Sequence, residues 1–206
     1  MFVHLRVHSE FSVSHGVNRI DEMVSRAVSF GQPALAISDQ FNLFGGLKFY
    51  QAARKAGIKP ILGSEVLVQS PDQKGSVAKL LLLISSQSGY LNLCHLLSVL
   101  WETALPSGPV GVTWDCLAKH SDGLIALSGF SAGWQGEALL GEDSSQSKAL
   151  AIELSRVFPH RFFLEIQRAG RPTDEPLVAA NAKLAADLGL PLVATHPVQF
   201  ETADDY

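Results

Sequence analysis

The sequence predicts an α/β fold in which helices cover a parallel sheet. Three observations indicate it: seven short apolar runs have strand character, helical patterns separate most of them, and the alternation contains no internal repeat. A closed or distorted barrel and an open doubly wound sheet both fit this order. Because no stretch resembles a linker, we expect a single domain over residues 1–206.

Each predicted element follows from its pattern of apolar residues. The strands are expected at 2–7, 33–38, 59–68, 79–85, 123–129, 161–167 and 190–195. The helices are expected at 18–30, 43–57, 89–104, about 146–157 and about 175–188, with Asn18 as a cap of the first. Residues 105–122 contain "PSGPVG" and "SDG", which predict a surface excursion.

Composition narrows the class of protein. Hydrophobic residues make up 47% and charged residues 17% of the 206, which favours a compact fold over disorder. The net charge of −4 argues against strong independent DNA binding. The longest apolar run, Leu80–Ile84, is far shorter than the roughly 20 residues of a membrane span. Cys94 and Cys116 have neither disulfide-framework nor zinc-type spacing, so we expect a cytoplasmic protein without membrane contact.

Conspicuous polar residues lie at or beyond the carboxyl ends of predicted strands, where α/β folds collect their active sites. They are Arg6, His8, Asp39, Gln40, Glu65, the stretch 128–130 and His196. Lys79 is the exception, because it begins its strand.

Arg6 and His8 are two residues apart, which on a strand places both on one face. Two histidines at this spacing would offer two imidazoles to one metal, but a guanidinium has no lone pair to donate. A buried histidine with a hydrogen-bond partner is the competing interpretation of His8. His4 is expected to be structural or exposed, and the remaining histidines, His95, His120 and His160, look like ordinary surface residues without partner ligands.

Six stretches, taken together, resemble the PHP (polymerase and histidinol phosphatase) domain in the form found at the N-terminus of bacterial DNA polymerase III alpha subunits. They are "FVHLRVHSEFSVSHG", "PALAISDQFNLFGGLKFY", "AGIKPILGSEV", "LLLLISSQSGYLNL", "GLIALSG" and "LPLVATHPVQF". The resemblance implies a distorted seven-stranded (β/α) barrel, similar to a TIM barrel. It also implies an N-terminal fragment of a much longer DNA-directed DNA polymerase, a nucleotidyltransferase of DNA replication.

Active members of this family bind about three metal ions through about nine His, Asp and Glu ligands and hydrolyse phosphoesters with a metal-activated water. Matched to that pattern, this sequence keeps His8 and Glu65, and His15 replaces an acidic ligand. The other matched ligand positions carry Arg6, Gln40, Lys79, Phe130, Pro197 and Gln199. Most of these side chains are poor metal ligands, and arginine and protonated lysine repel cations.

The resemblance therefore predicts a vestigial metal-site pocket without catalytic residues, bound metal or cofactor, with Mg²⁺ expected only in the absent polymerase domain. The pocket would comprise Arg6, His8, His15, Asp39, Gln40, Glu65, Lys79, Phe130, His196, Pro197 and Gln199. We expect Arg6 or Lys79 to pair with Glu65, since an unpaired buried carboxylate is costly. The alternative is that both cations reach solvent. A rival hypothesis is a zinc site of His8, His15 and His196.

Two classes of function fit these residues. The first is a structural and interaction module that supports the rest of the polymerase alpha subunit and, as the resemblance implies, docks the proofreading exonuclease subunit. The second is a residual metal-dependent phosphoesterase, pyrophosphatase or 3'-5' exonuclease. A stand-alone relative of histidinol phosphatase is a weaker option, because "FVHLRVHSEFS" and "NLFGGLKFY" are of the polymerase type.

Overall fold

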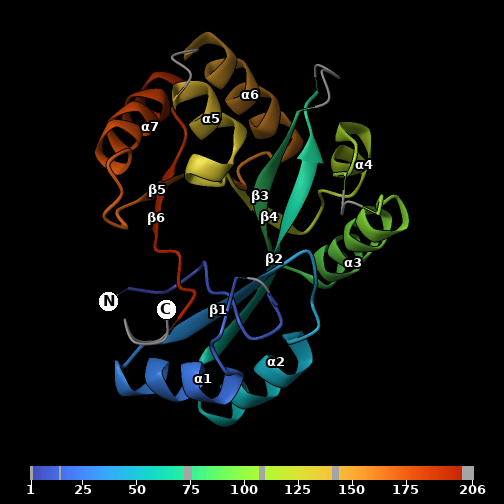
Figure 1. Ribbon diagram of the computed structural model, residues 1–206, viewed down its shortest axis with the longest axis vertical. Helices are drawn as coiled ribbons and strands as arrows, with labels where there is room; N and C mark the ends of the chain where they lie inside the picture. The colour runs from blue at the N-terminus through green and yellow to red at the C-terminus, as the bar shows by residue number, and fades with distance from the viewer. Residues whose placement is uncertain (1, 14, 72–75, 107–109, 141–143, 201–206) are drawn as a thin grey trace. The chain divides into compact units, whose positions relative to one another are not determined.

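The computed structural model describes residues 2–13, 15–71, 76–106, 110–140 and 144–200 (Figure 1). Its contacts divide the chain into two compact units. The first unit combines residues 1–65 with 195–206, and the second comprises residues 66–194. The strand β2 (Lys59–Gln69) begins in the first unit and ends in the second.

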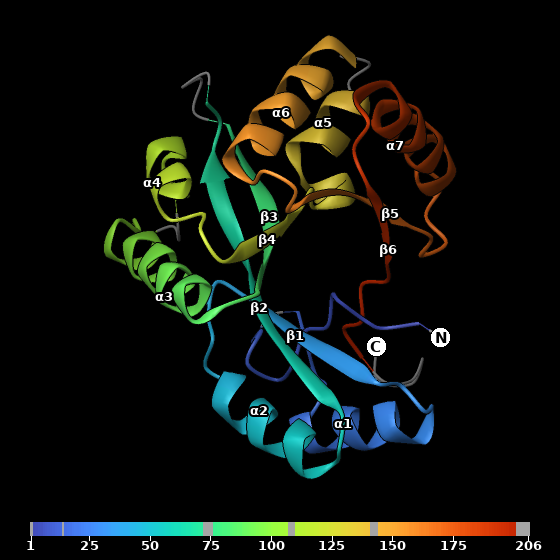
Figure 2. The same ribbon diagram turned by 180° about the vertical axis from the view of Figure 1, so that it is seen from behind.

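The first unit is built on two parallel strands. β1 (Ala34–Gln40) pairs with β2 in a register that runs from Ala34 opposite Lys59 to Gln40 opposite Glu65. The helices α1 (Ile20–Ser29) and α2 (Gly46–Lys55) lie side by side along these strands (Figures 1 and 2). This register places Gln40, the last residue of β1, next to Glu65 within β2.

Amphipathic helix α1 supplies much of the core of this unit. Its apolar residues recur at helical spacing, so Ile20, Met23, Val24 and Ala27 are buried, whereas Val28 is exposed. They pack with other buried residues of the first unit: Val7, Leu35, Ile37, Phe49, Ala53 and Ile58. Burial of each large apolar side chain contributes about 1.5–3 kcal/mol. This core holds β1 in place beneath the polar residues that follow it.

The predicted strand over 2–7 is wrong as a regular strand, and six strands are described instead of seven. The segment still follows β1, since Ala36 N donates to His4 O (3.0 Å) and Ser38 N donates to Val7 O (2.9 Å). However, Val7 N donates to the side-chain Oγ of Ser38 (2.8 Å) and not to a backbone carbonyl. This interrupts the ladder, so Val7 forms only an isolated parallel bridge with Val198.

In the second unit the end of β2 is followed in the sheet by β3 (Val77–Ile84), β4 (Leu124–Leu127), β5 (Phe162–Gln167) and β6 (Leu192–Thr195). β4 and β5 are parallel, but β3 and β4 are antiparallel, so the prediction of a parallel sheet is wrong at this pair. The connection from β2 to β3 is only residues 70–76, so β3 is expected to reverse direction after β2, and this reversal accounts for a strand antiparallel to β4. A parallel crossover needs about a dozen residues or more.

The helices of the second unit are α3 (Gln87–Glu102), α4 (Trp114–Lys119), α5 (Trp134–Leu140), α6 (Ser144–Val157) and α7 (Asp174–Leu188), with the 3-10 turn η1 (Phe130–Ala132). Figure 2 shows α5, α6 and α7 grouped together. Neither α4 nor α5 was predicted, because six and seven residues are too few to show helical periodicity. The region 105–122, expected as a surface excursion, contains α4, and residues 107–109 of it lie outside the described residues.

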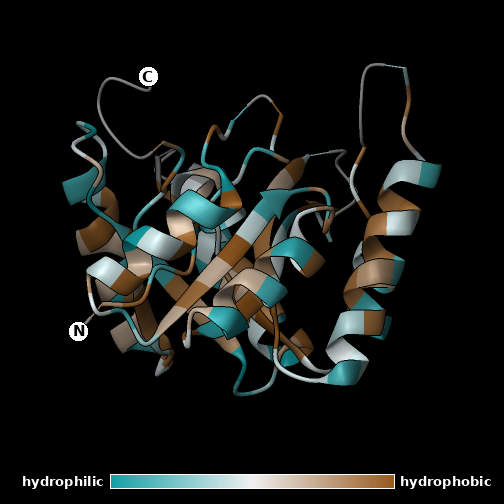
Figure 3. Ribbon diagram, turned by 90° about the horizontal axis from the view of Figure 1, so that it is seen from below, coloured by the Kyte–Doolittle hydropathy of each residue, from teal (hydrophilic) through white to brown (hydrophobic). Residues whose placement is uncertain are grey.

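Brown and teal residues alternate around the helices in Figure 3, as expected for helices with one buried face. Among the described residues, no helix combines the length and the apolar character that crossing a bilayer requires.

Candidate functional site

A buried ion pair in the first unit joins the N-terminal segment to Glu65 of β2. Arg6 is 5% exposed and Glu65 is 2% exposed. Arg6 Nη1 donates to Glu65 Oε1, and His8 Nε2 lies 3.2 Å from the same oxygen. The predicted pairing of Glu65 with a cation is therefore confirmed, with Arg6 as the partner. We refer to Arg6, His8 and Glu65 as the arginine cluster.

Burial explains why these charges need one another. Removing one partner of a buried ion pair leaves an uncompensated charge and costs about 3–5 kcal/mol. The period of two along the N-terminal segment brings Arg6 and His8 to the same face, as the sequence indicated. The result is a carboxylate whose negative charge is already balanced by a guanidinium of the same chain.

Asp39, at the end of β1, is bonded to the loop that follows His8. Its Oδ1 accepts from Ser9 N (2.7 Å) and Ser12 Oγ (2.6 Å), and its Oδ2 accepts from Ser9 Oγ (2.7 Å). Ser12 Oγ also accepts from Gln40 N (3.1 Å). The carboxylate therefore anchors the 9–12 loop. The sequence analysis missed Ser9 and Ser12, although two serines three residues apart after a strand are a recognisable source of such bonds.

His8 is held from its backbone as well. Asn18 Nδ2 donates to His8 O (2.8 Å), so Asn18 is not the predicted helix cap; Arg19 occupies that position. With Nε2 directed to Glu65, the buried Nδ1 of His8 has no hydrogen-bond partner in the described part of the chain. His8 is thus the buried histidine with a partner that the sequence allowed as an alternative.

Among the other predicted pocket residues of the first unit, Gln40 lies opposite Glu65 in the strand register. His15 and His196 are exposed, and Gln40, Pro197 and Gln199 are half-buried. The zinc hypothesis for His8, His15 and His196 is wrong for the described residues, whose one group of three donors within 4.8 Å consists of other side chains. Burial, and then electrostatic repulsion between the rings of His4 and His196, lower the pKa of His4.

Lys79 and Phe130 belong to the second unit. Phe130 is buried with a left-handed backbone (φ 50°), and Gly129 before it has φ 84°. A Cβ at Gly129 would lie 2.3 Å from Lys79 O, so only glycine fits there. Gly129 N donates to Oε2 of the fully buried Glu165 (3.1 Å), which the sequence analysis missed.

Glu165 has further partners in the same turn. Its backbone N donates to Ser128 Oγ (2.9 Å), and Gln167 Nε2 donates to its Oε1 (2.9 Å). Alternation along β5 places Glu165 and Gln167 on the same face, which was the available signal in "FFLEIQ". These bonds fix the turn that carries Phe130.

Comparison with known proteins places this geometry in a family. The family model described as the PHP domain matches residues 4–169. The DNA polymerase III subunit alpha of Pseudomonas fluorescens is 40% identical over 205 residues, which cover all of this chain and 18% of that subunit. The chain thus spans about a fifth of the length of this curated relative.

Solved structures support the same fold at low sequence identity. An amidohydrolase from Chromobacterium violaceum, solved with bound sulfate and no metal, matches with a TM-score of 0.61 and 14% identity, covering 96% of this chain and 90% of that one. A two-domain protein from Bacteroides vulgatus, whose description names a PHP-like metal-dependent phosphoesterase, has a TM-score of 0.56 and 14% identity, covering 96% of this chain and 51% of that one. The α/β architecture is thus of the TIM-barrel-like PHP type, and the chain belongs to the PHP domain family.

Proposed function

We propose that this chain is the PHP region of a replicative DNA polymerase III alpha subunit and that it serves the polymerase as a structural and docking module without hydrolysing phosphoesters. Identity of 40% along the whole chain to such a subunit supports the assignment. The proofreading exonuclease subunit is the proposed partner. The domain would rely on that subunit for 3'-5' hydrolysis.

The buried pairing of Arg6 with Glu65 is the observation that carries this proposal. PHP-type hydrolysis requires carboxylates and neutral imidazoles that give lone pairs to cations. Here a guanidinium, which keeps its charge at any physiological pH, already bonds the carboxylate. A metal ion at Glu65 would have to displace Arg6 and leave that guanidinium buried without its counter-charge.

The remaining donors of the first unit fit a metal cluster equally poorly. Asp39 uses both carboxylate oxygens for Ser9 and Ser12. His15 and His196 are exposed, and Pro197 has no side-chain ligand. The donor set therefore does not fit the three-metal site of active relatives, and we derive no metal-dependent step for it.

Hydrolysis of a generic phosphodiester tests the catalytic half of the proposal. The full-length protein is assayed with added Mn²⁺ or Zn²⁺, with and without EDTA, beside matched His8→Asn and Glu65→Gln variants. Glu65→Gln leaves Arg6 buried without its counter-charge, so circular dichroism first checks that each variant folds. Among the folded proteins we expect any residual turnover to be equal, because no metal-activated water forms at these residues. EDTA-sensitive turnover that falls in both variants would contradict the proposal and favour the residual phosphoesterase.

Cross-linking of the assembled polymerase tests the docking half. With a lysine-reactive reagent, the exonuclease subunit should cross-link to exposed lysines within residues 1–206, such as Lys48, Lys55, Lys119 or Lys148. Addition of excess unreactive exonuclease should reduce those cross-links. Cross-links confined to the rest of the alpha subunit would contradict docking on this region.

A further inference from the structure

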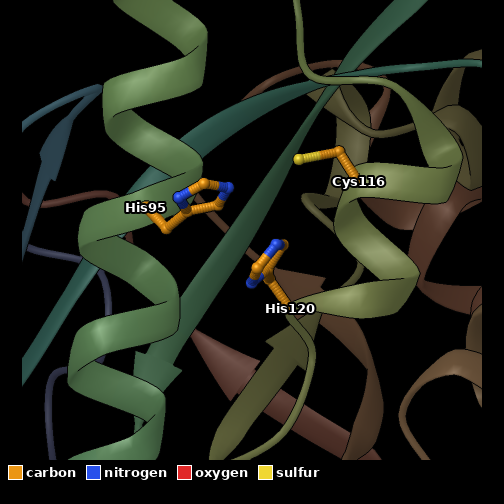
Figure 4. Close-up of side chains that lie close together, drawn as sticks. All are labelled: His95, Cys116 and His120. Carbon is orange, nitrogen blue, oxygen red and sulfur yellow. The ribbon is translucent and has the colours of Figure 1, made fainter.

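A second group of chemically active side chains lies in the second unit, where α3 and α4 meet (Figure 4). His95 lies on α3, Cys116 lies on α4, and His120 follows α4 as its C-cap. One donor atom from each of the three lies within 4.8 Å of the others. We refer to these three residues as the cysteine–histidine cluster. It shares no residue with the arginine cluster.

Helix geometry explains how the cluster forms. Cys116 and His120 are four residues apart, so they point to the same side of α4. Thr113 Oγ1 starts this helix by accepting from Cys116 N (3.3 Å), and Leu117 anchors it in the core. The ring of His95 then lies opposite that of His120, with centroids 4.1 Å apart and planes tilted by 39°.

Neighbouring groups orient His120. Asn92, one turn before His95 on α3, donates its Nδ2 to Asp122 O (2.9 Å). The amide oxygen Oδ1 of Asn92 is then an acceptor and lies 3.3 Å from His120 Nδ1. His120 Nδ1 therefore carries the ring proton, and Nε2 keeps the lone pair. Histidines that bind a metal through one ring nitrogen usually donate the N–H of the other nitrogen to a fixed acceptor.

The charge state of the cluster is compatible with coordination. Burial, then His95 and Lys119, lower the pKa of His120, which favours the neutral imidazole. Burial raises the pKa of the Cys116 thiol, so a metal would displace its proton on binding. The positive charge of Lys119 acts on Cys116 in the opposite direction to burial. Among the ion pairs of the described residues, none of the kind that joins Arg6 to Glu65 includes Cys116 or His120.

We propose that His95, Cys116 and His120 bind one Zn²⁺ ion, with the fourth tetrahedral position open to water. Two imidazole nitrogens and one thiolate are donors that Zn²⁺ prefers, whereas Mg²⁺ and Ca²⁺ prefer oxygen. Tetrahedral bonds of about 2.0–2.3 Å place ligand atoms roughly 3.3–3.8 Å apart. Since 4.8 Å is the upper limit of the donor separations, coordination needs a contraction of at most about 1.5 Å. His95 is exposed, so its side chain can rotate toward the ion.

Cobalt titration of the full-length protein is the direct test, because Co²⁺ replaces Zn²⁺ in such sites and a cobalt–thiolate bond has a charge-transfer absorption. We expect one equivalent of this absorption, and we expect Zn²⁺ to abolish it by displacement. Cys116→Ser should remove it. Cys94→Ser is the matched control, because Cys94 is a half-buried free cysteine outside the cluster, so the absorption should be retained.

Histidine variants give the second readout. His95→Asn should weaken zinc affinity more than Asn92→Ala, for which loss of an outer-shell partner predicts about a 10–100-fold decrease. His160→Asn is the matched control, since His160 is exposed with φ 58°, a conformation that asparagine tolerates. Circular dichroism of every variant checks that it folds. The proposal is overturned if folded wild-type protein shows no thiolate–cobalt absorption, or if Cys116→Ser and Cys94→Ser affect it equally.

Discussion

The arginine cluster and the cysteine–histidine cluster both contain side chains that can bind a metal ion, but they differ in burial and in whether a charge of the chain already occupies those side chains. The first is buried, and its carboxylate already has a cation from its own chain. The second is half-buried or exposed and presents imidazoles and a thiol, which are neutral in their unbound forms. Burial forces a charged group to find a partner within the protein, whereas neutral donors near solvent cost little when they bind nothing. A dense set of buried polar residues is therefore weaker evidence for a ligand site than a few solvent-accessible ligand atoms that lie close together.

Replacement of Arg6 should have the largest effect on stability, because the two clusters differ most in how their charges are balanced. We expect Arg6→Met to lower the free energy of unfolding by about 3–5 kcal/mol, because Glu65 is left as a buried charge. Urea denaturation measures the change. The matched variant His95→Asn, in metal-free protein, should change stability by no more than about 0.5 kcal/mol, as is usual for exposed positions.

The double variant Arg6→Met with Glu65→Leu sharpens the same point. Since replacement of both charges removes the unpaired carboxylate, it should restore much of the lost stability. Lys48→Met breaks the exposed Lys48–Glu10 pair (3.1 Å) and is the control. If Arg6→Met lowers the free energy of unfolding by no more than Lys48→Met does, the charge of Arg6 is not required to neutralise Glu65.

Asp39 should show a smaller effect of the same kind. Asp39→Asn removes a charged acceptor from Ser9 and Ser12, and hydrogen bonds to charged groups are worth about 1.5–3 kcal/mol. We expect a loss of that size in urea denaturation and faster amide exchange at Ser9. The exposed Asp187→Asn is the control, with a change within about 0.5 kcal/mol. Equal effects of the two variants would contradict an anchoring role for Asp39.

The smallest expected effect concerns the histidine pairs of the two units. Burial and His196 lower the pKa of His4 in the folded protein, so the unfolded chain binds this proton more readily than the folded chain does. The effect of His4 on the free energy of unfolding is absent above its ordinary pKa. As the pH drops below about 6.5, protonation of His4 lowers the free energy of unfolding. His196→Asn should raise the pKa of His4 only in part, since burial is the larger cause. NMR titration of the His4 ring measures this shift.

Zinc then separates the two pairs of histidines. It should move the ring signals of His120 and leave those of His4 unchanged. A zinc-dependent shift at His4 that persists in Cys116→Ser would contradict the assignment of the metal to the second unit.

Local patterns predicted much of the first unit correctly. Helical spacing predicts one buried face of Ile20, Met23, Val24, Ala27 and Val28, because helix period and burial are linked, and only Val28 of these is exposed. The pairing of Glu65 with a cation was also predictable, since an arginine that shares a face with His8 cannot stay buried alone. The reversed direction of β3 could have been predicted as well, because residues 70–76, which join β2 to β3, are too few for a parallel crossover.

Sequence alone determined the residue types, their periodicity and the fixed charge of Arg6, and from these follow the α/β class, most element positions and the closed state of the arginine cluster. Only the tertiary structure decided that Ser9 and Ser12 bond Asp39 and that His95 meets Cys116 and His120. Period and propensity act over a few residues, whereas the distance from His95 to His120 depends on how α3 and α4 pack. The spacing of Cys116 and His120 along α4 follows from the sequence, whereas the position of His95 beside them follows from the packing of α3 and α4.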